Sequence, residues 1–421
     1  MRREALTTAG FSAAALILWA VAAQYRPGSA TPAILSDQGE LFYPKFADPQ
    51  AATTVEVLDY DEATATARPL KVELRRGRWI ISSHNDYPVD AAERLVKTAA
   101  ALVDLKKDAV ASDSAEEHGN FGVIDPLDQN VATLTGRGKR VTLRDAHREV
   151  LADYIFGRPV EGKPGFRYLR VPGQKRTYVV KTDADPSARL ADWLSGGVLQ
   201  ISAATVRKLT LVNYSIDETM GRILNNEVTT LTQSSGRWRA AEGEKVNEAA
   251  VRSIAATLSG LRVVDVRPKP PSLAADLRAG TIQLTLEGVM ALRQRGYFVT
   301  PTGRLLANQG EMLVETADGL VYNLRFGEVA ASGPEAMSAG KASENRHLFV
   351  TVRFDPAKAA QYGGDAERGQ RLAKALNDKF AGWFYIINSG DFRNLQRKRS
   401  ELVSASGAPA VDAPPPAPAE Q

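Results

Sequence analysis

Short runs in which apolar and polar residues alternate recur along most of the chain, and this alternation predicts β-strands. Residues 54–60 and 70–74 form two such runs in the first half, and residues 228–231 form another in the second half. Further runs extend over residues 131–134, 140–143, 150–156, 166–171 and 176–181. Gly and Pro separate most of them, which is typical of antiparallel hairpins rather than of parallel strands joined by helices.

Two segments instead repeat their apolar positions at the helical period. In the first, residues 90–107, Asp90 is followed three residues later by Glu93, and this spacing predicts a capping box at the start of a helix. The second, residues 247–259, is followed by Gly260, which is placed to end a helix. A helix is therefore expected after the first strands in each half of the chain.

Several short sequences recur in the same order in the two halves. Gly77-Arg78-Trp79 returns as Gly236-Arg237-Trp238, and the two tryptophans are expected to anchor a core rather than to stack on a ligand. Two further pairs are Tyr154-Ile155-Phe156-Gly157 with Leu324-Arg325-Phe326-Gly327, and Asp192-Trp193-Leu194 with Gly382-Trp383-Phe384. The common order predicts a duplication. The predicted fold is α+β, with two duplicated lobes at residues 53–203 and 204–403, each an antiparallel sheet with packed helices.

The second repeat is the longer one, with surplus length predicted at residues 292–311, at residues 330–344 and in a helix near residues 366–380. Insertions in repeats map to loops, where binding surfaces arise. The candidate partner-binding residues are Arg295, Tyr297, Phe298, Asn308 and Glu311, in a segment that the first repeat is expected to lack. The alternative interpretation is a hairpin that only covers its own lobe.

The amino terminus carries the strongest targeting signal. Arg2 and Arg3 precede an uncharged run over residues 5–23, whose length as a helix is close to the ~30 Å hydrocarbon thickness of a bilayer. Residues 1–24 are therefore predicted to be a transmembrane anchor, with the amino terminus inside the cell and the bulk of the chain outside it. A cleaved signal peptide is the alternative, since Ala20-Val21-Ala22 fits a cleavage site. Residues 25–52 are predicted to be a linker and residues 404–421 a disordered Ala/Pro-rich tail.

Composition narrows the classes of function. The net charge is +4, and no cluster of Lys and Arg is interleaved with aromatic residues, so nucleic-acid binding is not predicted. Cysteine is absent, which excludes disulfides, thiol catalysis and Cys-ligated zinc.

The sequence offers little catalytic chemistry. The four histidines lack metal-ligand spacing, and neither a phosphate-binding loop nor a Gly-x-Ser-x-Gly elbow occurs. Ser338 and Lys341 match the Ser-x-x-Lys pattern of penicillin-interacting enzymes, but the partner motifs of those enzymes are absent. We therefore expect a protein that is not an enzyme, with no metal and no cofactor.

The chain resembles a bacterial family known as domain of unknown function 4340. The matching residues are Gly77-Arg78-Trp79, Phe121-Gly122-Val123-Ile124-Asp125-Pro126, Arg295-Gly296-Tyr297-Phe298, Asn308-Gln309-Gly310-Glu311 and the segment from Gly319 to Gly327. The likeness is expected to extend over residues 55–402. It implies a single-pass envelope protein of the kind often encoded beside ABC-type transporters related to gliding motility, and it supplies no catalytic residue.

Three hypotheses of function follow. The first is a non-catalytic accessory or scaffold subunit of an ABC-type transport assembly, held in the bacterial cytoplasmic membrane and projecting into the periplasm, with a permease or another envelope protein as its partner. The second is an envelope module that captures a polysaccharide, lipid or peptide between its lobes. The third is a hydrolase that uses Ser338 with Lys341, or carboxylates that are scattered along the sequence.

Overall fold

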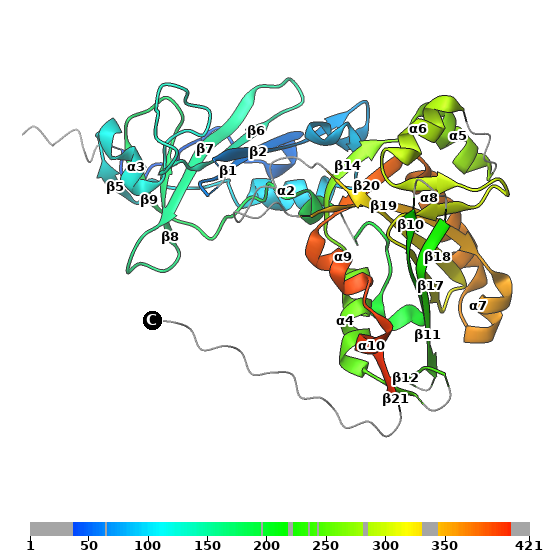
Figure 1. Ribbon diagram of the computed structural model, residues 1–421. Coiled ribbons are helices and arrows are strands. Elements are labelled where there is room, and N and C mark those ends of the chain that lie inside the picture. The colour runs from blue at the N-terminus through cyan, green and yellow to red at the C-terminus, as the bar shows by residue number, and fades with distance from the viewer. Residues whose placement is uncertain are drawn as a thin grey trace, which may run out of the picture.

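Two antiparallel sheets with helices packed on them make up the body of the protein, which is a mixed α/β structure (Figure 1). The computed structural model describes residues 37–63, 65–194, 197–217, 222–234, 236–241, 244–280, 285–330 and 344–405. One sheet belongs to the first lobe, drawn in blue to green, and the other to the second lobe, drawn in green to red. The predicted anchor, Ser338 and Lys341, and nearly all of the predicted tail lie outside the described residues.

The first lobe contains a nine-stranded sheet in the order β4-β3-β2-β1-β6-β7-β8-β9-β5. Its strands are β1 (Thr54–Asp61), β2 (Thr66–Arg75), β3 (Arg78–Ile81), β4 (Tyr87–Pro88), β5 (Ala109–Ser112), β6 (Lys139–Arg144), β7 (Val150–Pro159), β8 (Phe166–Arg170) and β9 (Thr177–Lys181). Its α-helices are α2 (Ala92–Ala100) and α3 (His118–Phe121). Helix α2 begins after Ala91 and is shorter than the predicted 90–107, and its apolar stripe buries Leu95 and Ala99.

The second lobe contains an eight-stranded sheet in the order β12-β11-β10-β17-β18-β19-β20-β14. Its strands are β10 (Val206–Asp217), β11 (Arg222–Ser234), β12 (Arg237–Arg239), β14 (Val263–Pro268), β17 (Glu311–Thr316), β18 (Leu320–Val329), β19 (Arg346–Phe354) and β20 (Trp383–Ile387). Two small ribbons accompany it, β13 (Glu244–Val246) with β21 (Val403–Ala405), and β15 (Tyr297–Val299) with β16 (Leu305–Ala307). Its helices are α4 (Glu248–Ser259), α5 (Pro271–Ala279), α6 (Leu286–Arg293), α7 (Pro356–Tyr362), α8 (Ala366–Ala381), α9 (Ser389–Leu395) and α10 (Arg399–Leu402).

The two sheets have the same strand order. Read from β3 to β5, each strand of the first sheet has a counterpart at the same place in the second, from β12 to β14. The register agrees as well: Phe156 on β7 lies opposite Leu169, and Phe326 on β18 lies opposite Leu348. In both lobes the pairing shifts directly after that phenylalanine. The Phe-Gly landmark predicted from the sequence therefore occupies equivalent positions.

Steric crowding explains why the Phe-Gly landmark contains glycine in both lobes. A Cβ atom on Gly157 would overlap the carbonyl oxygen of Phe121, and one on Gly327 would overlap the carbonyl oxygen of Arg295. In each lobe the chain that leaves a helix crosses the bulged strand so closely that only glycine fits. The glycine therefore recurs in the sequence because the same close backbone contact occurs in both lobes.

The third landmark pair is not equivalent. Trp193 lies in a short 3-10 helix, η5 (Leu190–Trp193), that follows the last strand of the first sheet, whereas Trp383 begins β20. The true counterpart of Tyr385 is Tyr178, because these two residues pair with Leu348 and Leu169 respectively. Trp193 and Trp383 were paired only because each is a tryptophan in a similar short sequence. Such a sequence does not indicate to which strand, if any, the tryptophan belongs.

The surplus length of the second lobe is found mainly in helices. Helices α5 and α6 precede the β15–β16 hairpin, and helices α7 and α8 separate β19 from β20, whereas β8 and β9 are joined by a short turn. Most of the surplus predicted at 330–344 lies outside the described residues. The expectation that 295–311 has no counterpart is wrong, since residues 122–138 make the same connection in the first lobe.

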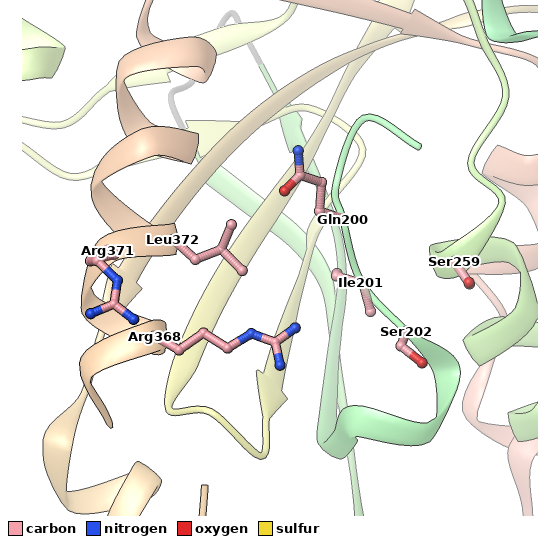
Figure 2. Close-up of a pocket in the computed structure, with 7 residues that line it drawn as sticks. All are labelled: Gln200, Ile201, Ser202, Ser259, Arg368, Arg371 and Leu372. Carbon is pink, nitrogen blue, oxygen red and sulfur yellow. The ribbon is translucent and has the colours of Figure 1, made fainter. Parts of the chain in front are cut away.

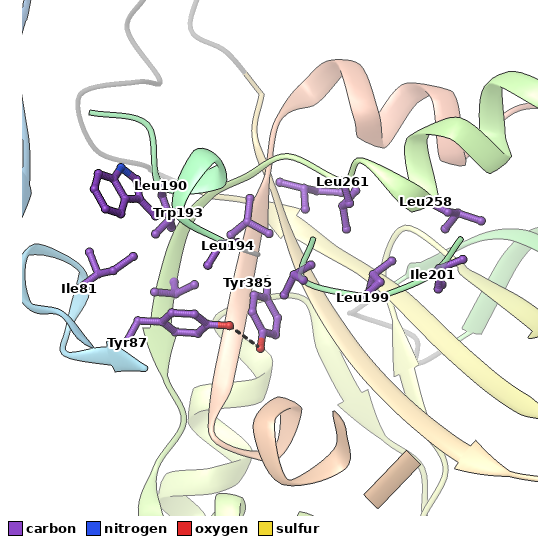
Figure 3. Close-up of a cluster of buried hydrophobic side chains, with 14 of the residues drawn as sticks. Ile81, Tyr87, Leu190, Trp193, Leu194, Leu199, Ile201, Leu258, Leu261 and Tyr385 are labelled. Carbon is purple, nitrogen blue, oxygen red and sulfur yellow. Dashed lines mark hydrogen bonds between the residues drawn. The ribbon is translucent and has the colours of Figure 1, made fainter. Parts of the chain in front are cut away.

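A continuous hydrophobic core joins the two lobes. Tyr87 of the first lobe points toward Tyr385 of the second, and Trp193, Leu194 and Leu261 belong to the same buried cluster (Figure 3). The Tyr87 ring also meets the Trp383 ring edge-on, with 5.0 Å between centroids. The core prediction holds fully for Trp238, which is 8% exposed, while Trp79 is half-buried at the edge of the core.

None of the helices in the described ranges combines the length and the apolar composition that a membrane crossing requires.

Candidate functional site

The outer edge of the second lobe is where the added elements gather. Helices α5 and α6 and the β15–β16 hairpin enclose a small hydrophobic cluster of their own, made by Leu273, Leu292, Tyr297, Leu305, Ala307, Phe349 and Phe384. Local sequence explains the two helices: Pro271 begins α5, Gly280 ends it in the left-handed conformation, and Thr285 caps α6 by accepting a 3.1 Å bond from the Gly288 amide. The residues that begin, end and cap these two helices all lie within some 25 residues of chain.

Three of the five candidate partner-binding residues lie inside this lobe. Tyr297 is fully buried and stacks on Phe384, with ring centroids 6.2 Å apart and an interplanar angle of 7°. Asn308 and Glu311 are each 5% exposed. The predicted exposed face is therefore wrong for these three residues, because the hairpin folds back over its own lobe as in the alternative interpretation. Only Arg295 and Phe298 remain half-buried.

Glu311 is the centre of a buried polar network. Its carboxylate accepts bonds from the Arg304 Nη2 atom at 2.8 Å and from the Asn323 Nδ2 atom at 3.0 Å, and it lies 3.4 Å from the Arg325 Nε atom. Asn308 donates separately to the Glu328 carboxylate at 2.6 Å. Charges that are paired and hydrogen-bonded in this way hold the hairpin to the sheet.

Arg295 lines a cavity of about 770 Å³ between the start of α5 and the exposed side of α6. The cavity is lined by Pro268, Lys269, Pro270, Pro271, Leu286, Glu287, Met290, Ala291, Gln294 and Arg295. Its walls are largely apolar, and Lys269 and Arg295 are the basic residues in its lining. Leu286 is 77% exposed and Met290 is 53% exposed, although both are apolar.

Lys269 is buried beneath this cavity, with 4% of its surface exposed. Its Nζ atom donates to the carbonyl oxygens of Phe380 at 2.7 Å and Trp383 at 2.6 Å, and it lies 4.1 Å from the centroid of the Phe349 ring. Burial, together with the nearby Arg295 guanidinium, lowers the pKa of Lys269 well below its usual value. The two carbonyl oxygens and the ring face oppose that shift, because each stabilises an ammonium group.

Arg295 is the more accessible of the two cations. Its guanidinium lies 4.5 Å from the centroid of the Phe384 ring, and its Nη1 atom donates to the Ala291 carbonyl at 2.8 Å. Its Nε atom is buried and has no hydrogen-bond partner in the described part of the chain. Burial lowers the pKa of Arg295, and over the same residues no carboxylate forms an ion pair with Arg295 or with Lys269.

A third basic group lies beside them. Burial, together with the positive charges of Arg295 and Arg267, lowers the pKa of His347 to about 4. The His347 Nδ1 atom is buried without a hydrogen-bond partner among the described residues. Arg267 is paired with Asp265 at 2.7 Å, so among the described residues Arg295 is the guanidinium of this cluster that has no carboxylate partner.

The first lobe differs at the equivalent place. The register that aligns Leu169 with Leu348 also aligns Tyr168 with His347, and the crossing that aligns Gly157 with Gly327 aligns Phe121 with Arg295. In the first lobe Phe121 packs against Tyr168, with 4.6 Å between ring centroids. An aromatic contact in one lobe thus corresponds to a cationic cluster in the other.

A second cavity, of about 640 Å³, opens where the segment between the lobes passes α8 (Figure 2). Arg368 and Arg371 reach toward it from α8, and Gln200 and Ser202 line the opposite side. All four side chains are exposed. Solvated groups of this kind hold an anion weakly, so this cavity is the poorer candidate.

The histidines do not assemble into a site. His84 contacts Ser83, the His118 ring lies 2.7 Å from the Lys175 carbonyl oxygen, and His147 is in an exposed turn. In the ranges that the structure describes, no group of His, Asp and Glu is arranged to hold a metal ion.

Sequence reasoning found Arg295 but missed Lys269. The available signal was Pro268-Lys269-Pro270-Pro271, a lone lysine between prolines that follows an apolar strand. Because prolines fix the backbone, such a lysine cannot easily turn away from the interior.

Comparison with known proteins gives one match. Residues 79–279 match the family described as Domain of unknown function (DUF4340). The chain resembles this family. The match begins at Trp79 in the first lobe and ends at the last residue of α5 in the second, so it is narrower than the expected 55–402 and excludes Arg295 and Glu311. No curated protein and no solved structure matches the chain.

Proposed function

We propose that this protein is a non-catalytic accessory or scaffold subunit of an ABC-type transport assembly, anchored in the bacterial cytoplasmic membrane by residues 5–23 with its two lobes in the periplasm. The uncharged amino-terminal run supports the anchor. The association with a transporter rests on the resemblance to a family whose members are often encoded beside ABC-type transporters. Under this proposal the lobes arose by duplication, which the common strand order supports.

The observation that carries the proposal is the closed interface between the lobes. A module that captures a ligand between two lobes needs them to separate, whereas a scaffold needs them to stay together. Here Tyr87 and Tyr385 are both fully buried, and the Asn85 Nδ2 atom donates to the Val266 carbonyl at 2.9 Å across the same boundary. Burial of large aromatic side chains on both sides favours a rigid arm over a clamp.

The positions of the cavities also favour a rigid scaffold over a clamp that closes on a ligand. Those lined by His118 and by Leu58 lie within the first lobe, and the one lined by Arg295 lies within the second. The cavity lined by Arg368 involves only the second lobe and the segment that leads into it. A ligand that entered any of them would not be enclosed between the lobes.

The absence of cysteine allows a direct test of rigidity. Val150→Cys on β7 and Val228→Cys on β11, at positions 46% and 48% exposed, would place one spin label on each lobe of the full-length protein in detergent. A scaffold gives one narrow interlabel distance distribution, and Tyr87→Ala broadens it. Two resolved distances in the otherwise unchanged protein would favour the clamp and oppose the proposal.

A further inference from the structure

Two basic side chains, Lys269 and Arg295, line the α6 cavity without a carboxylate partner in the described part of the chain. Lys269 and Arg295 are neighbours, and in the region that the structure describes neither is paired with a carboxylate. Withdrawing a cation from water without a partner is costly, so the folded protein gains if an anion enters. The Lys269 ammonium already donates to two carbonyl oxygens, which leaves Arg295 as the group that can make contact.

The opposite end of the cavity is apolar and open to solvent. Leu286 and Met290 are four residues apart on α6, so their side chains share one face of the helix. Pro270 and Pro271 form the facing wall. The volume of about 770 Å³ is within the range of small-molecule sites.

We infer that this cavity binds a small anionic amphiphile, whose head lies on the Arg295 guanidinium and whose apolar chain lies along Leu286 and Met290. The inference is independent of the proposed scaffold role. The positive charge of Arg295 requires an anionic head group on the ligand, and the exposed apolar side chains of Leu286 and Met290 require an apolar ligand chain. Glu287 on the rim disfavours ligands with several negative charges. A carboxylate, a phosphate diester or a singly charged phosphate monoester head meets these requirements, and the source is either a free fatty acid or a phospholipid.

The first lobe provides an internal comparison. Phe121 and Tyr168 occupy the places of Arg295 and His347 there, so the charge required for binding is missing. The binding site is thus a property of the second lobe alone, although the strands beneath it are shared by both.

Thermal unfolding of the full-length protein in a non-ionic detergent, followed by tryptophan fluorescence, tests this with short soluble probes. Octanoate or octyl phosphate should raise the melting temperature by several degrees, because a ligand that binds only the folded state stabilises it. Octan-1-ol, acetate and inorganic phosphate, which have only the chain or only the head, should give much smaller shifts. A larger shift with octanoate identifies a carboxylate ligand, and a larger shift with octyl phosphate identifies a phospholipid head.

Two variants locate the site. Arg295→Gln removes the charge, and Met290→Glu places a carboxylate on the exposed apolar wall without altering the core; each should abolish the shift. Leu127→Glu, at a position 59% exposed in the first lobe, is the matched control and should keep it. Equal shifts with octanoate and octan-1-ol, no shift with either anion, or a full shift in Met290→Glu would each overturn the inference.

Discussion

The hydroxyl oxygen of Tyr87 in the first lobe lies 3.4 Å from the hydroxyl oxygen of Tyr385 in the second. Burial raises the pKa of Tyr87 to about 12 and raises that of Tyr385 well above its usual value, so both hydroxyls stay protonated throughout the physiological range. The pair is surrounded by the core that both lobes share. The pair therefore lies where the hydrophobic cores of the two lobes join into one.

Tyr87→Ala should lower the free energy of unfolding by about 3–5 kcal/mol, because it leaves a large cavity where the lobes meet. Tyr87→Phe, which removes only the long hydrogen bond, should cost about 1 kcal/mol. Chemical denaturation of both variants measures the difference. Similar small losses in the two would mean that the interface is loosely packed.

Gly327→Ala should destabilise the second lobe by about 1–3 kcal/mol or more, since the added methyl group meets the Arg295 carbonyl. Gly260→Ala is the control: its methyl group would lie 3.6 Å from the Ala256 carbonyl oxygen, in ordinary contact, and its cost should stay below about 1 kcal/mol. Equal unfolding midpoints for the two variants would contradict the close crossing.

Sequence patterns predicted much of this architecture. Alternation located many of the strands, but the strand predicted at residues 131–134 is wrong, because that run lies in the connection before β6. The recurring Gly-Arg-Trp and Phe-Gly landmarks fall at equivalent positions in the two sheets, because each is tied to a turn or bulge that only certain residues allow. The landmarks at Trp193 and Trp383 gave a wrong pairing, because neither tryptophan lies at a turn or bulge that requires a particular residue. The interior position of Glu311 was also missed, since a charged residue is buried only when distant partners such as Arg325 come to meet it.

Glu311→Ala should lower the free energy of unfolding by about 3–5 kcal/mol, because it leaves the largely buried Arg325 charge without its carboxylate. Arg304→Ala removes a partner that is 61% exposed and should cost less than about 1 kcal/mol. Denaturation curves compare the two. If Glu311→Ala were as stable as the wild type and instead lost a binding partner, the original prediction of a partner-binding face would be restored.

Stability should fall on acidification through His347. The pKa is about 4 in the folded protein and about 6.5 in the unfolded chain, so the unfolded chain takes up the proton first. The contribution of neutral His347 is therefore complete above pH 6.5 and is lost as the pH falls toward 4, by up to about 3 kcal/mol. His347→Gln should flatten this part of the pH profile, whereas the exposed His147→Gln should not. Parallel profiles for His347→Gln and the wild type would show that burial does not exclude the proton.

The scaffold role is tested most directly by purifying the tagged full-length protein from native membranes in a mild detergent and quantifying the proteins that accompany it. The expected result is enrichment of a transporter permease with the wild type and equally with Ser338→Ala, which should also restore function to a deletion strain. The absence of any enriched membrane partner would contradict the account. So would a Ser338→Ala protein that is stable and keeps its partner but fails to restore function, because that outcome would indicate chemistry at Ser338.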